Sequence, residues 1–446
     1  MAQSSIGIGM IGFGTVGGGV AMLLRDHADL YARRVGATLE LRRVLVRDRN
    51  KAVAMGLVAP EAVCTDVEEF FATPDIGIVV EAAGGLDPIG GLVRRALGSG
   101  RHVVTANKTL LAQEGPELFA LARRHEVAIA FEASCAGGIP IITAMKFGLM
   151  ANRIDGLYGI LNGTCNYILT EMTQCSKTYD QALAEAQERG FAEADPALDV
   201  SGRDAAQKLA ILASLAFGVQ ARGEQVWAEG IQGLELEDIR FGSELGYDIK
   251  LLAIAQRVGH DLSSPDDHDT LSLRVHPCFI HRTKPLAQVH GSFNAISVIG
   301  HAVGHTMYLG HGAGRMPTAS AVVSDLLNVA SGWYAHAFRR LNIWPDLHAP
   351  ARLIDADDLE SRFYIRLNAR DVPGVMAKVS TILGDAGISL SALMQHESAA
   401  GQFVPVVITT HAARQGALLG ALDQIEQLDV VQGRPVRVRI LDIPEP

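Results

Sequence analysis

The chain has 446 residues, which is enough for about two to four domains. It is 48% hydrophobic and 20% charged, as is ordinary for a globular protein. Its formal net charge of −10 argues against a nucleic-acid-binding protein, whereas small anionic ligands held by local groups are compatible with it.

The first predicted element pair surrounds a glycine turn. Residues 6–11 form a short apolar strand, GFGTVG follows at 12–17, and a helical segment continues to about Tyr31. This order is the dinucleotide-binding fingerprint, in which Gly12, Gly14 and Gly17 allow a tight turn and a close backbone approach to a pyrophosphate. A tight βα turn without a ligand is the alternative, because a single GxGxxG is a weak signal.

The second predicted strand, 39–46, ends at two charged residues, Arg47 and Asp48. In nucleotide folds this strand end lies at the adenosine ribose. An acidic residue there favours a free 2′-hydroxyl, and an arginine favours a 2′-phosphate. Because the sequence offers both, NAD and NADP both stay open.

Strands and helices alternate through the rest of the N-terminal region. Strands are predicted over 77–81, 102–105 and 127–131, with a helix over 86–97. The alternation indicates an α/β class with a Rossmann-type, doubly wound parallel sheet over 1–134. Ligands bind such sheets at the carboxyl ends of the strands, where Lys108 and Glu132 lie. A solvated lysine at a helix start is the simpler interpretation of Lys108 alone.

The pattern changes after Glu132, and we predict an α+β catalytic and oligomerisation domain over 135–340. Helices are predicted over 141–150, 166–174, 180–189 and 317–338, and strands over 158–161, 271–280 and 306–309. The last of these helices follows a glycine turn and is expected to return to the first domain.

Within this domain, a buried helix carries a single charge. Ser201, followed three residues later by Asp204, predicts a capping box that opens the helix. Lys208 is the only charged residue between Ala205 and Ala221. Lys208 and Asp204 form a simple helix ion pair at this spacing, or else Lys208 is a desolvated lysine that handles a proton. These residues alone favour the ion pair.

A linker is predicted over 341–361, and a third domain over 362–446. Its strands are predicted at 363–367, 388–395, 402–410 and 436–441, and its helices at 375–386 and 415–427. This βαββαβ order is the ferredoxin-like arrangement.

The cysteines and the chain's hydropathy bear on location. The five cysteines are scattered without a CxxC pair, which favours a reducing compartment. The N-terminus lacks a signal-peptide pattern, and the most apolar stretch, residues 209–220, is too short to span a bilayer. We therefore expect a cytoplasmic protein without a membrane partner.

Several long motifs, in order along essentially the whole chain, carry a family resemblance. They are GFGTVG (12–17), VVTANK (103–108), FEASCAGGIPII (131–142), LNGTCNYILTEM (161–172), GFAEADPALDVSGRDAAQKLAILASLAFG (190–218), GAGRMPTASAV (312–322) and DVPGVMAKVSTIL (371–383). The chain resembles homoserine dehydrogenases of the long, monofunctional type, which carry a C-terminal ACT domain.

The resemblance implies reversible reduction of L-aspartate 4-semialdehyde to L-homoserine by NADPH or NADH, in threonine, methionine and isoleucine biosynthesis. It makes Lys208 the proton donor and Lys108 a second catalytic lysine that contacts nicotinamide and substrate. Its substrate-binding residues are Glu193 and Asp204, with Asp199 nearby. Its cofactor-binding residues are Gly12, Phe13, Gly14, Thr15, Val16, Gly17, Arg47, Lys108 and Gly312.

The resemblance also implies a structural sodium or potassium ion after the sixth strand. Its ligands are an oxygen of Glu132 and the carbonyl groups of Cys135, Gly137 and Ile139. Position 135 is usually valine in the family, and a backbone carbonyl survives the change to cysteine.

The ACT domain implies regulation by an amino acid, most simply threonine, with Asp371 and Gly374 as regulatory residues. ACT domains pair at subunit interfaces, so a homodimer or homotetramer is expected, with no nucleic-acid partner.

Two other functions compete with this interpretation. An aspartate-semialdehyde dehydrogenase-like enzyme needs a nucleophilic cysteine with a histidine base, and Cys135 is the only cysteine at a suitable position. A non-enzymatic amino-acid or nucleotide sensor needs no pair of lysines beside carboxylates.

Overall fold

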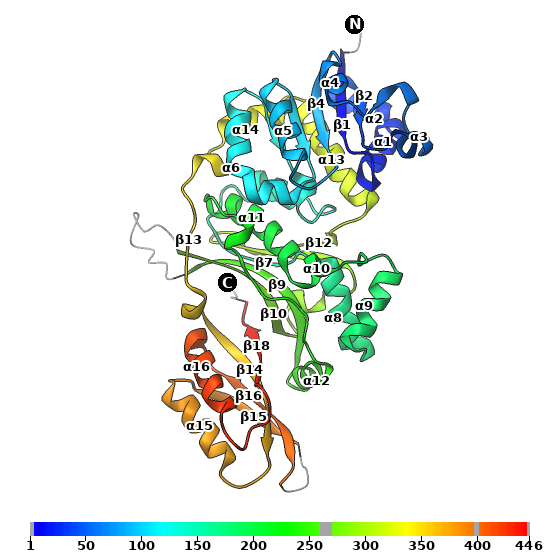
Figure 1. The fold of residues 1–446 in the computed structure, drawn as a ribbon. Helices are drawn as coiled ribbons and strands as arrows, with labels where there is room; N and C mark the ends of the chain where they lie inside the picture. Colours follow the sequence, from blue (N-terminus) through cyan, green and yellow to red (C-terminus); the bar gives the residue numbers. More distant parts are fainter. Residues whose placement is uncertain (1–3, 259–269, 397–400, 444–446) are drawn as a thin grey trace. The chain divides into compact units, whose positions relative to one another are not determined.

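The computed structural model describes residues 4–258, 270–396 and 401–443 (Figure 1). The chain divides into two compact units. The first contains Met1–Gly163, Asp204–Val226 and Phe293–Ala351, and the second contains Thr164–Arg203, Trp227–Ser292 and Arg352–Pro446. Each unit is thus assembled from stretches far apart in the sequence. No helix within the described ranges has both the length and the hydropathy needed to cross a membrane.

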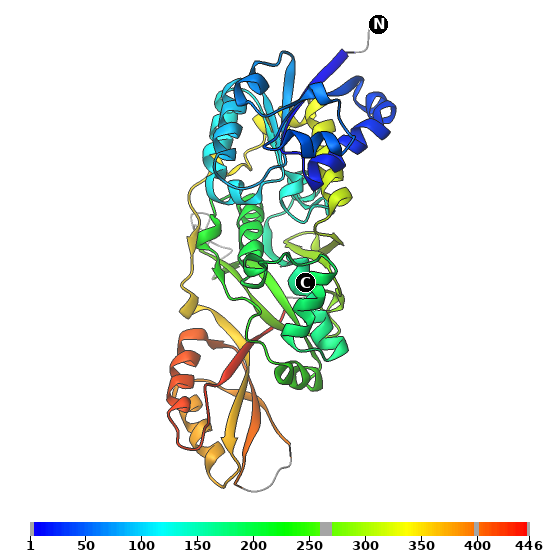
Figure 2. The same cartoon turned by 45° about the vertical axis from the view of Figure 1, so that its right-hand side comes forward.

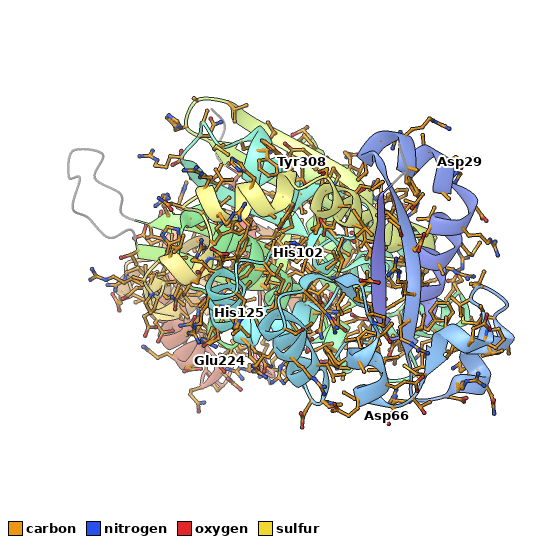
Figure 3. All side chains as sticks on the ribbon, turned by 90° about the horizontal axis from the view of Figure 1, so that it is seen from above. Asp29, Asp66, His102, His125, Glu224 and Tyr308 are labelled. Carbon is orange, nitrogen blue, oxygen red and sulfur yellow. The ribbon has the colours of Figure 1, made fainter. Side chains whose placement is uncertain are left out.

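The first unit contains a six-stranded parallel sheet of order β3-β2-β1-β4-β5-β6. Its strands are β1 (Ser4–Ile11), β2 (Ala37–Leu45), β3 (Val63–Cys64), β4 (Ile76–Glu81), β5 (His102–Thr105) and β6 (Ile129–Ala130). Its helices are α1 (Thr15–Asp26), α2 (Ala28–Val35), α3 (Arg49–Ala54), α4 (Val67–Ala72), α5 (Ile89–Gly98) and α6 (Lys108–Arg124). This strand order confirms the predicted Rossmann-type sheet. The carboxylates Asp29 and Asp66 are exposed at the surface of this unit (Figure 3).

Helix α13 (Arg315–Ala330) packs against α1, as predicted for a helix that returns to the nucleotide fold. The two helices approach closely at Gly19, where an added Cβ would come within 2.9 Å of the Ala319 Cβ. The predicted helix 317–338 is, however, two helices. Gly332 has φ +78°, and the chain resumes as α14 (Trp333–Arg340). A left-handed glycine ends a helix at little cost.

The first unit also holds an antiparallel sheet of order β12-β11-β7. Its strands are β7 (Ile154–Ile160), β11 (Phe293–Gly300) and β12 (Gly304–His311). Helix α11 (Arg203–Phe217) is the helix predicted to be buried, and it contains Lys208. The predicted helix 141–150 is the short α7 (Ile141–Thr143), which continues as a π-helix over Ala144–Gly148.

The second unit is built on two long antiparallel strands, β9 (Tyr247–Val258) and β10 (Thr270–His281). Its other elements before the C-terminal domain are α8 (Gly163–Cys175), α9 (Tyr179–Glu188), α10 (Ala197–Val200), β8 (Trp227–Ala228), α12 (Leu236–Glu244) and β13 (Arg352–Leu353).

The C-terminal part of this unit confirms the predicted βαββαβ order. Its elements are β14 (Glu360–Arg370), α15 (Val375–Asp385), β15 (Leu390–Gln395), β16 (Phe403–Thr410), β17 (Ala413–Arg414), α16 (Gln415–Glu426) and β18 (Val436–Leu441). The strand order is β18-β14-β16-β15, with both helices on one face (Figure 2). Alternate residues of β14, Phe363, Ile365 and Leu367, join the core on that face. Strand β18 also pairs in parallel with β10.

Candidate active site

Helix α11 has buried residues on nearly every side, which confirms the buried helix predicted from its apolar sequence. Its start differs from the prediction. Ser201 ends α10, and its hydroxyl donates to the Leu198 carbonyl at 3.3 Å. The predicted capping box is therefore wrong, and Gly202, with φ +78°, makes the turn between the two helices.

The carboxylate of Asp204 lies between two lysines. Its Oδ2 accepts from Lys208 Nζ at 2.7 Å, and its Oδ1 is 3.2 Å from Lys108 Nζ. Asp204 is 4% exposed, so this network is largely removed from water. The i, i+4 ion pair predicted from the sequence is present. The structure adds Lys108, which lies far from Asp204 in the sequence but belongs to the same unit.

Two polar groups from the residues directly after β7 also bond to Lys208 and Asp204. The Leu161 carbonyl accepts from Lys208 Nζ at 2.8 Å. The Asn162 amide donates to Asp204 Oδ2 at 2.8 Å. The sequence prediction missed Asn162 as a site residue, although it lies in the LNGT motif at the carboxyl end of a strand. Together these contacts fix the Lys208 ammonium in one place.

Although burial by itself raises the pKa of Asp204, the ammonium groups of Lys208 and Lys108 outweigh it. With the hydrogen bonds from Lys208 and Asn162, they lower this pKa to about 2. Asp204 is therefore ionised throughout the range in which enzymes work, and it keeps a negative charge beside both lysines.

This pKa predicts a contribution to acid stability. The ordinary value is 3.8 and the folded value is lower, so the ionised group stabilises the fold above pH 4. The stabilisation is lost as the pH falls through about 2, and amounts to about 2 kcal/mol for such a shift. Urea unfolding of the wild type and Asp204→Asn should show a stability difference that shrinks by this amount from pH 5 to pH 2. A difference independent of pH would contradict the depressed pKa.

The position of Lys108 is fixed by hydrogen bonds at the carboxyl ends of two neighbouring strands of the parallel sheet. It is the first residue of α6, whose N-cap residue Asn107 accepts from the Leu110 N–H at 3.1 Å and donates to the Gly85 carbonyl at 2.6 Å. The buried Glu81 at the end of β4 accepts from the Thr105 hydroxyl at 2.6 Å. These bonds tie the carboxyl ends of β4 and β5 together, which is where ligands bind in such sheets.

The glycine turn fits a dinucleotide. Gly12 has φ +89°, and a Cβ there would come within 2.6 Å of the Ala83 nitrogen. A Cβ at Gly17 would lie 2.6 Å from the Gly12 carbonyl oxygen. At Gly14, the N-cap of α1, a Cβ would meet no described atom within 4 Å. The turn is thus closed on the sheet side and open at the helix N-terminus, which is the end of a helix that binds phosphate groups in dinucleotide folds.

The other predicted cofactor residues adjoin this turn and the end of β2. Phe13 is buried, Val16 is partly buried, and Thr15 and Arg47 are exposed. Asp48 caps α3, because its side chain accepts from the Lys51 N–H at 3.0 Å. Of the two charges at the strand end, the acidic one therefore already has a structural partner.

The segment predicted to bind a monovalent cation is a buried turn. Glu132 uses its carboxylate to accept from the N–H groups of Ile142 and Thr143, both at 2.8 Å. The Gly137 N–H donates to the Gly312 carbonyl at 2.8 Å, which places the predicted residue Gly312 beside this turn. Cys135, Gly137 and Ile139 are all buried.

Cys135 is not poised as a nucleophile. It is buried, and burial raises the pKa of its thiol to about 12. Its Sγ lies 3.7 Å from the Lys208 carbonyl oxygen. A thiol protonated at neutral pH does not suit the acylating mechanism considered as an alternative.

The remaining predicted substrate residues belong to the second unit. Asp199 lies in α10, and its Oδ2 is 3.2 Å from the Thr164 hydroxyl. Glu193 is exposed in the loop before α10, and its carbonyl accepts from the Gln187 amide at 3.2 Å.

Comparison with known proteins decides the family. Family models match residues 12–132 as the NAD-binding domain of homoserine dehydrogenase, 140–327 as homoserine dehydrogenase and 363–428 as an ACT domain. Homoserine dehydrogenase of Pseudomonas aeruginosa is 41% identical over 97% of this chain and 98% of its own length. That of Synechocystis is also 41% identical, over 98% of this chain and 100% of its own. The chain belongs to the homoserine dehydrogenase family.

Solved structures agree with this assignment. A homoserine dehydrogenase from Thiobacillus denitrificans has a TM-score of 0.90 and 42% identity, covering 98% of this chain and 99% of that one. The S. aureus homoserine dehydrogenase has a TM-score of 0.75 and 31% identity over 99% of this chain and 100% of its own. The chain is therefore an oxidoreductase that uses a nicotinamide dinucleotide and a small-molecule substrate. The thiol-acylating and sensor alternatives are wrong.

Proposed function

We propose that the chain interconverts L-aspartate 4-semialdehyde and L-homoserine, with Lys208 as the proton donor in the reducing direction. The observation that carries this assignment is the Asp204 carboxylate, which holds two lysine ammonium groups at the end of the parallel sheet. The Lys208 side chain is 12% exposed, and a lysine that is largely shielded from water beside a fixed carboxylate is a positioned acid.

When bound, the nicotinamide supplies hydride to the aldehyde carbon. The aldehyde oxygen gains negative charge as the hydride is transferred. Lys208 stabilises that charge and then donates a proton to this oxygen. Lys108, at 31% side-chain exposure, is the more accessible lysine and suits contact with nicotinamide and substrate. Both oxygens of Asp204 already accept from these lysines and Asn162, so we assign Asp204 mainly to positioning.

The remaining roles follow from chemistry. Homoserine carries an ammonium group, which carboxylates bind, and we propose Glu193 and Asp199 for this task. The exposed Arg47 is the cationic group at the end of β2, which supports recognition of a 2′-phosphate. An archaeal homoserine dehydrogenase, 25% identical with a TM-score of 0.60, was solved with NADPH. We therefore propose that NADP is accepted.

The test of this function is a steady-state assay of the purified full chain with L-homoserine and either NAD or NADP. We expect homoserine-dependent formation of reduced cofactor, and faster turnover with NADP if Arg47 reads the 2′-phosphate. If homoserine causes no reduction of either dinucleotide, the proposed reaction is wrong.

We also propose the structural sodium or potassium ion. The Glu132 carboxylate accepts from two N–H groups, whereas its main-chain carbonyl accepts only a long bond, at 3.4 Å from the Cys135 nitrogen, among the described contacts, so we assign this carbonyl to the cation. Ala136, with φ +48°, turns the segment that contains the other three carbonyl groups. Such an ion would stabilise the conformation of this turn and would take no part in the reduction.

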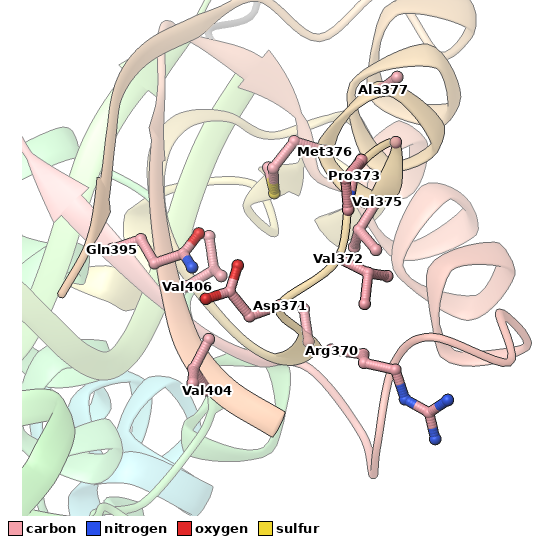
Figure 4. Close-up of a pocket in the computed structure, with 12 residues that line it drawn as sticks. Arg370, Asp371, Val372, Pro373, Val375, Met376, Ala377, Gln395, Val404 and Val406 are labelled. Carbon is pink, nitrogen blue, oxygen red and sulfur yellow. The ribbon is translucent and has the colours of Figure 1, made fainter. Parts of the chain in front are cut away.

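A cavity of about 300 Å³ lies at the start of α15 in the ACT domain. The side chains of Asp371, Gln395 and Met376 point into it, whereas Arg370 points away (Figure 4). Gly374, with φ +91°, is the N-cap of α15. A carboxylate for an ammonium group, and a helix N-terminus for a carboxylate, suit a free amino acid, and we propose threonine as the effector.

This proposal predicts a selective loss of regulation. Asp371→Ala should weaken the effect of threonine on activity at least tenfold in concentration, with kcat in its absence unchanged, because the ammonium loses its counter-charge. Arg370→Ala is the matched control and should respond like the wild type. An equal threonine response in both variants, or no response in the wild type, would remove support for this site. Dose–response curves of initial rate measure the effect.

We propose that the chain is a homodimer or homotetramer. Strand β12 is an edge of its sheet in the first unit, and it exposes Leu309 by 57% and Met307 by 36%. The neighbouring Phe293 is 41% exposed. Exposed apolar side chains along a sheet edge favour pairing with a second copy.

The predicted domain limits and location complete the proposal. The family models cover 12–132, 140–327 and 363–428, which supports boundaries near 134 and 361, and the end of α14 at Arg340 supports the boundary at 340. The scattered cysteine pattern supports a cytoplasmic location.

A further inference from the structure

A second cavity in the second unit lies where β18 runs beside β10. Its volume is about 130 Å³, and its lining includes Glu229, Gly230, Gly233, Pro277, Arg437 and Arg439. It shares no lining residue with the ACT cavity described above. Nothing in the proposed reaction or in the proposed threonine regulation uses it.

Positive charge exceeds negative charge on the walls of this cavity. Arg437 and Arg439 are two residues apart on β18 and so point to the same face. Each has one guanidinium nitrogen near Glu229 Oε2, at 3.5 Å from Arg437 and 3.7 Å from Arg439. These distances exceed the usual 2.7–3.2 Å of N–H···O hydrogen bonds, so Glu229 only partly neutralises the pair.

Arg439 is the more deeply placed of the two. Its side chain is 3% exposed, lies over the Trp227 ring at 4.5 Å, and donates through Nη2 to the Gln415 side chain. The buried Arg274 adds a third guanidinium in the same region of β10. Burial, followed by Arg439, Arg274 and Arg437, lowers the pKa of His276 well below its ordinary value. The positive field of all three arginines therefore reaches that ring.

A buried excess of positive charge is costly unless an anion accompanies it. Arginine presents donors in a planar fork that matches a carboxylate or a phosphate. A water molecule occupies about 30 Å³ in the liquid, so the cavity has room for a group of about four or five non-hydrogen atoms. Gly233 also lines the cavity, and an added Cβ there would meet no described atom within 4 Å.

We infer that this cavity is a binding site for a small oxyanion, a carboxylate or phosphate group held between Arg437 and Arg439. Its occupant would join β18 of the ACT domain to the 229–234 loop and β10 within the same unit. Glu229 sets the selectivity, since it leaves room for one anionic group and disfavours a second.

Isothermal titration calorimetry of the full chain tests the site, with sodium phosphate and sodium acetate as separate probes at matched ionic strength. We expect at least one of the two anions to bind the wild type, and which of them binds distinguishes phosphate from carboxylate recognition. Arg437→Gln should weaken that binding at least tenfold. Arg434→Gln, at an exposed position just before β18, is the charge-matched control and should bind like the wild type.

A second variant guards against misfolding. Arg437→Lys keeps the charge without the fork, and we expect binding between that of the wild type and Arg437→Gln, with homoserine turnover retained as the measure of folding. The inference is overturned if neither anion binds the wild type, or if Arg437→Gln and Arg437→Lys bind as tightly as Arg434→Gln.

Discussion

Replacing Lys208 with alanine should lower kcat by about 10²–10⁴-fold, the usual contribution of a positioned general acid. The Lys208 ammonium is held by Asp204 Oδ2 and the Leu161 carbonyl, whereas Lys108 contacts the other oxygen of Asp204, so truncation removes the ammonium from the position that we assign to the proton donor. The dinucleotide should bind with nearly unchanged affinity, because the glycine turn at Gly12–Gly17 is left intact. Steady-state rates with homoserine and fluorescence titration with reduced cofactor measure the two quantities.

The control for this variant is Arg203→Ala, which removes an exposed cation at the start of the same helix. It should leave kcat within about twofold, since surface changes are usually small in effect. Near-normal turnover in Lys208→Ala would remove Lys208 from the proton-transfer role. Equal losses of cofactor affinity and kcat would show a general disturbance of the site.

Replacing Asp204 with asparagine should have the second largest effect. The change removes the negative charge between Lys108 and Lys208 and leaves two cations close together with little water. Breaking a buried ion pair by removing one partner costs about 3–5 kcal/mol, although the amide can keep some of the hydrogen bonds. We therefore expect a loss of about 3 kcal/mol in unfolding free energy and a fall of about 10²-fold in kcat, as for a general acid that is displaced.

Asp195→Asn is the matched control for that change. Asp195 is exposed in the loop before α10 and accepts only locally, from the Ala197 N–H at 3.1 Å among the described contacts. Urea unfolding and steady-state rates should give wild-type values for it. If Asp204→Asn is as stable and as active as this control, the carboxylate does not position the lysines.

The order of elements was predictable because each element leaves a local signal. The GFGTVG turn, the short apolar strands and the βαββαβ pattern all concern neighbours within a few residues, and the structure confirms them. The pairing of Asp204 with Lys208 was predictable for the same reason, since one turn of helix separates them.

Contacts between distant segments carry no such signal. Lys108 reaches Asp204 only because two parts of the chain fold into one unit, and Asn162 joins them from the end of β7. Sequence motifs singled out both lysines through family resemblance, but they gave no sign that one carboxylate holds both. The Ser201 spacing was misleading because Gly202 allows a sharper turn, in which the Ser201 hydroxyl bonds backwards to Leu198.

The kcat of the Asp204→Asn/Lys208→Ala double variant tests most directly whether Asp204 and Lys208 act as one unit. If Asp204 contributes to kcat by holding Lys208, then Asp204→Asn should lower kcat little further in a chain that already lacks Lys208. Residues that act together give such non-additive losses. We predict a kcat within about threefold of Lys208→Ala alone, since distant sites add and coupled ones do not. A double variant whose loss equals the product of the two single losses would contradict this account.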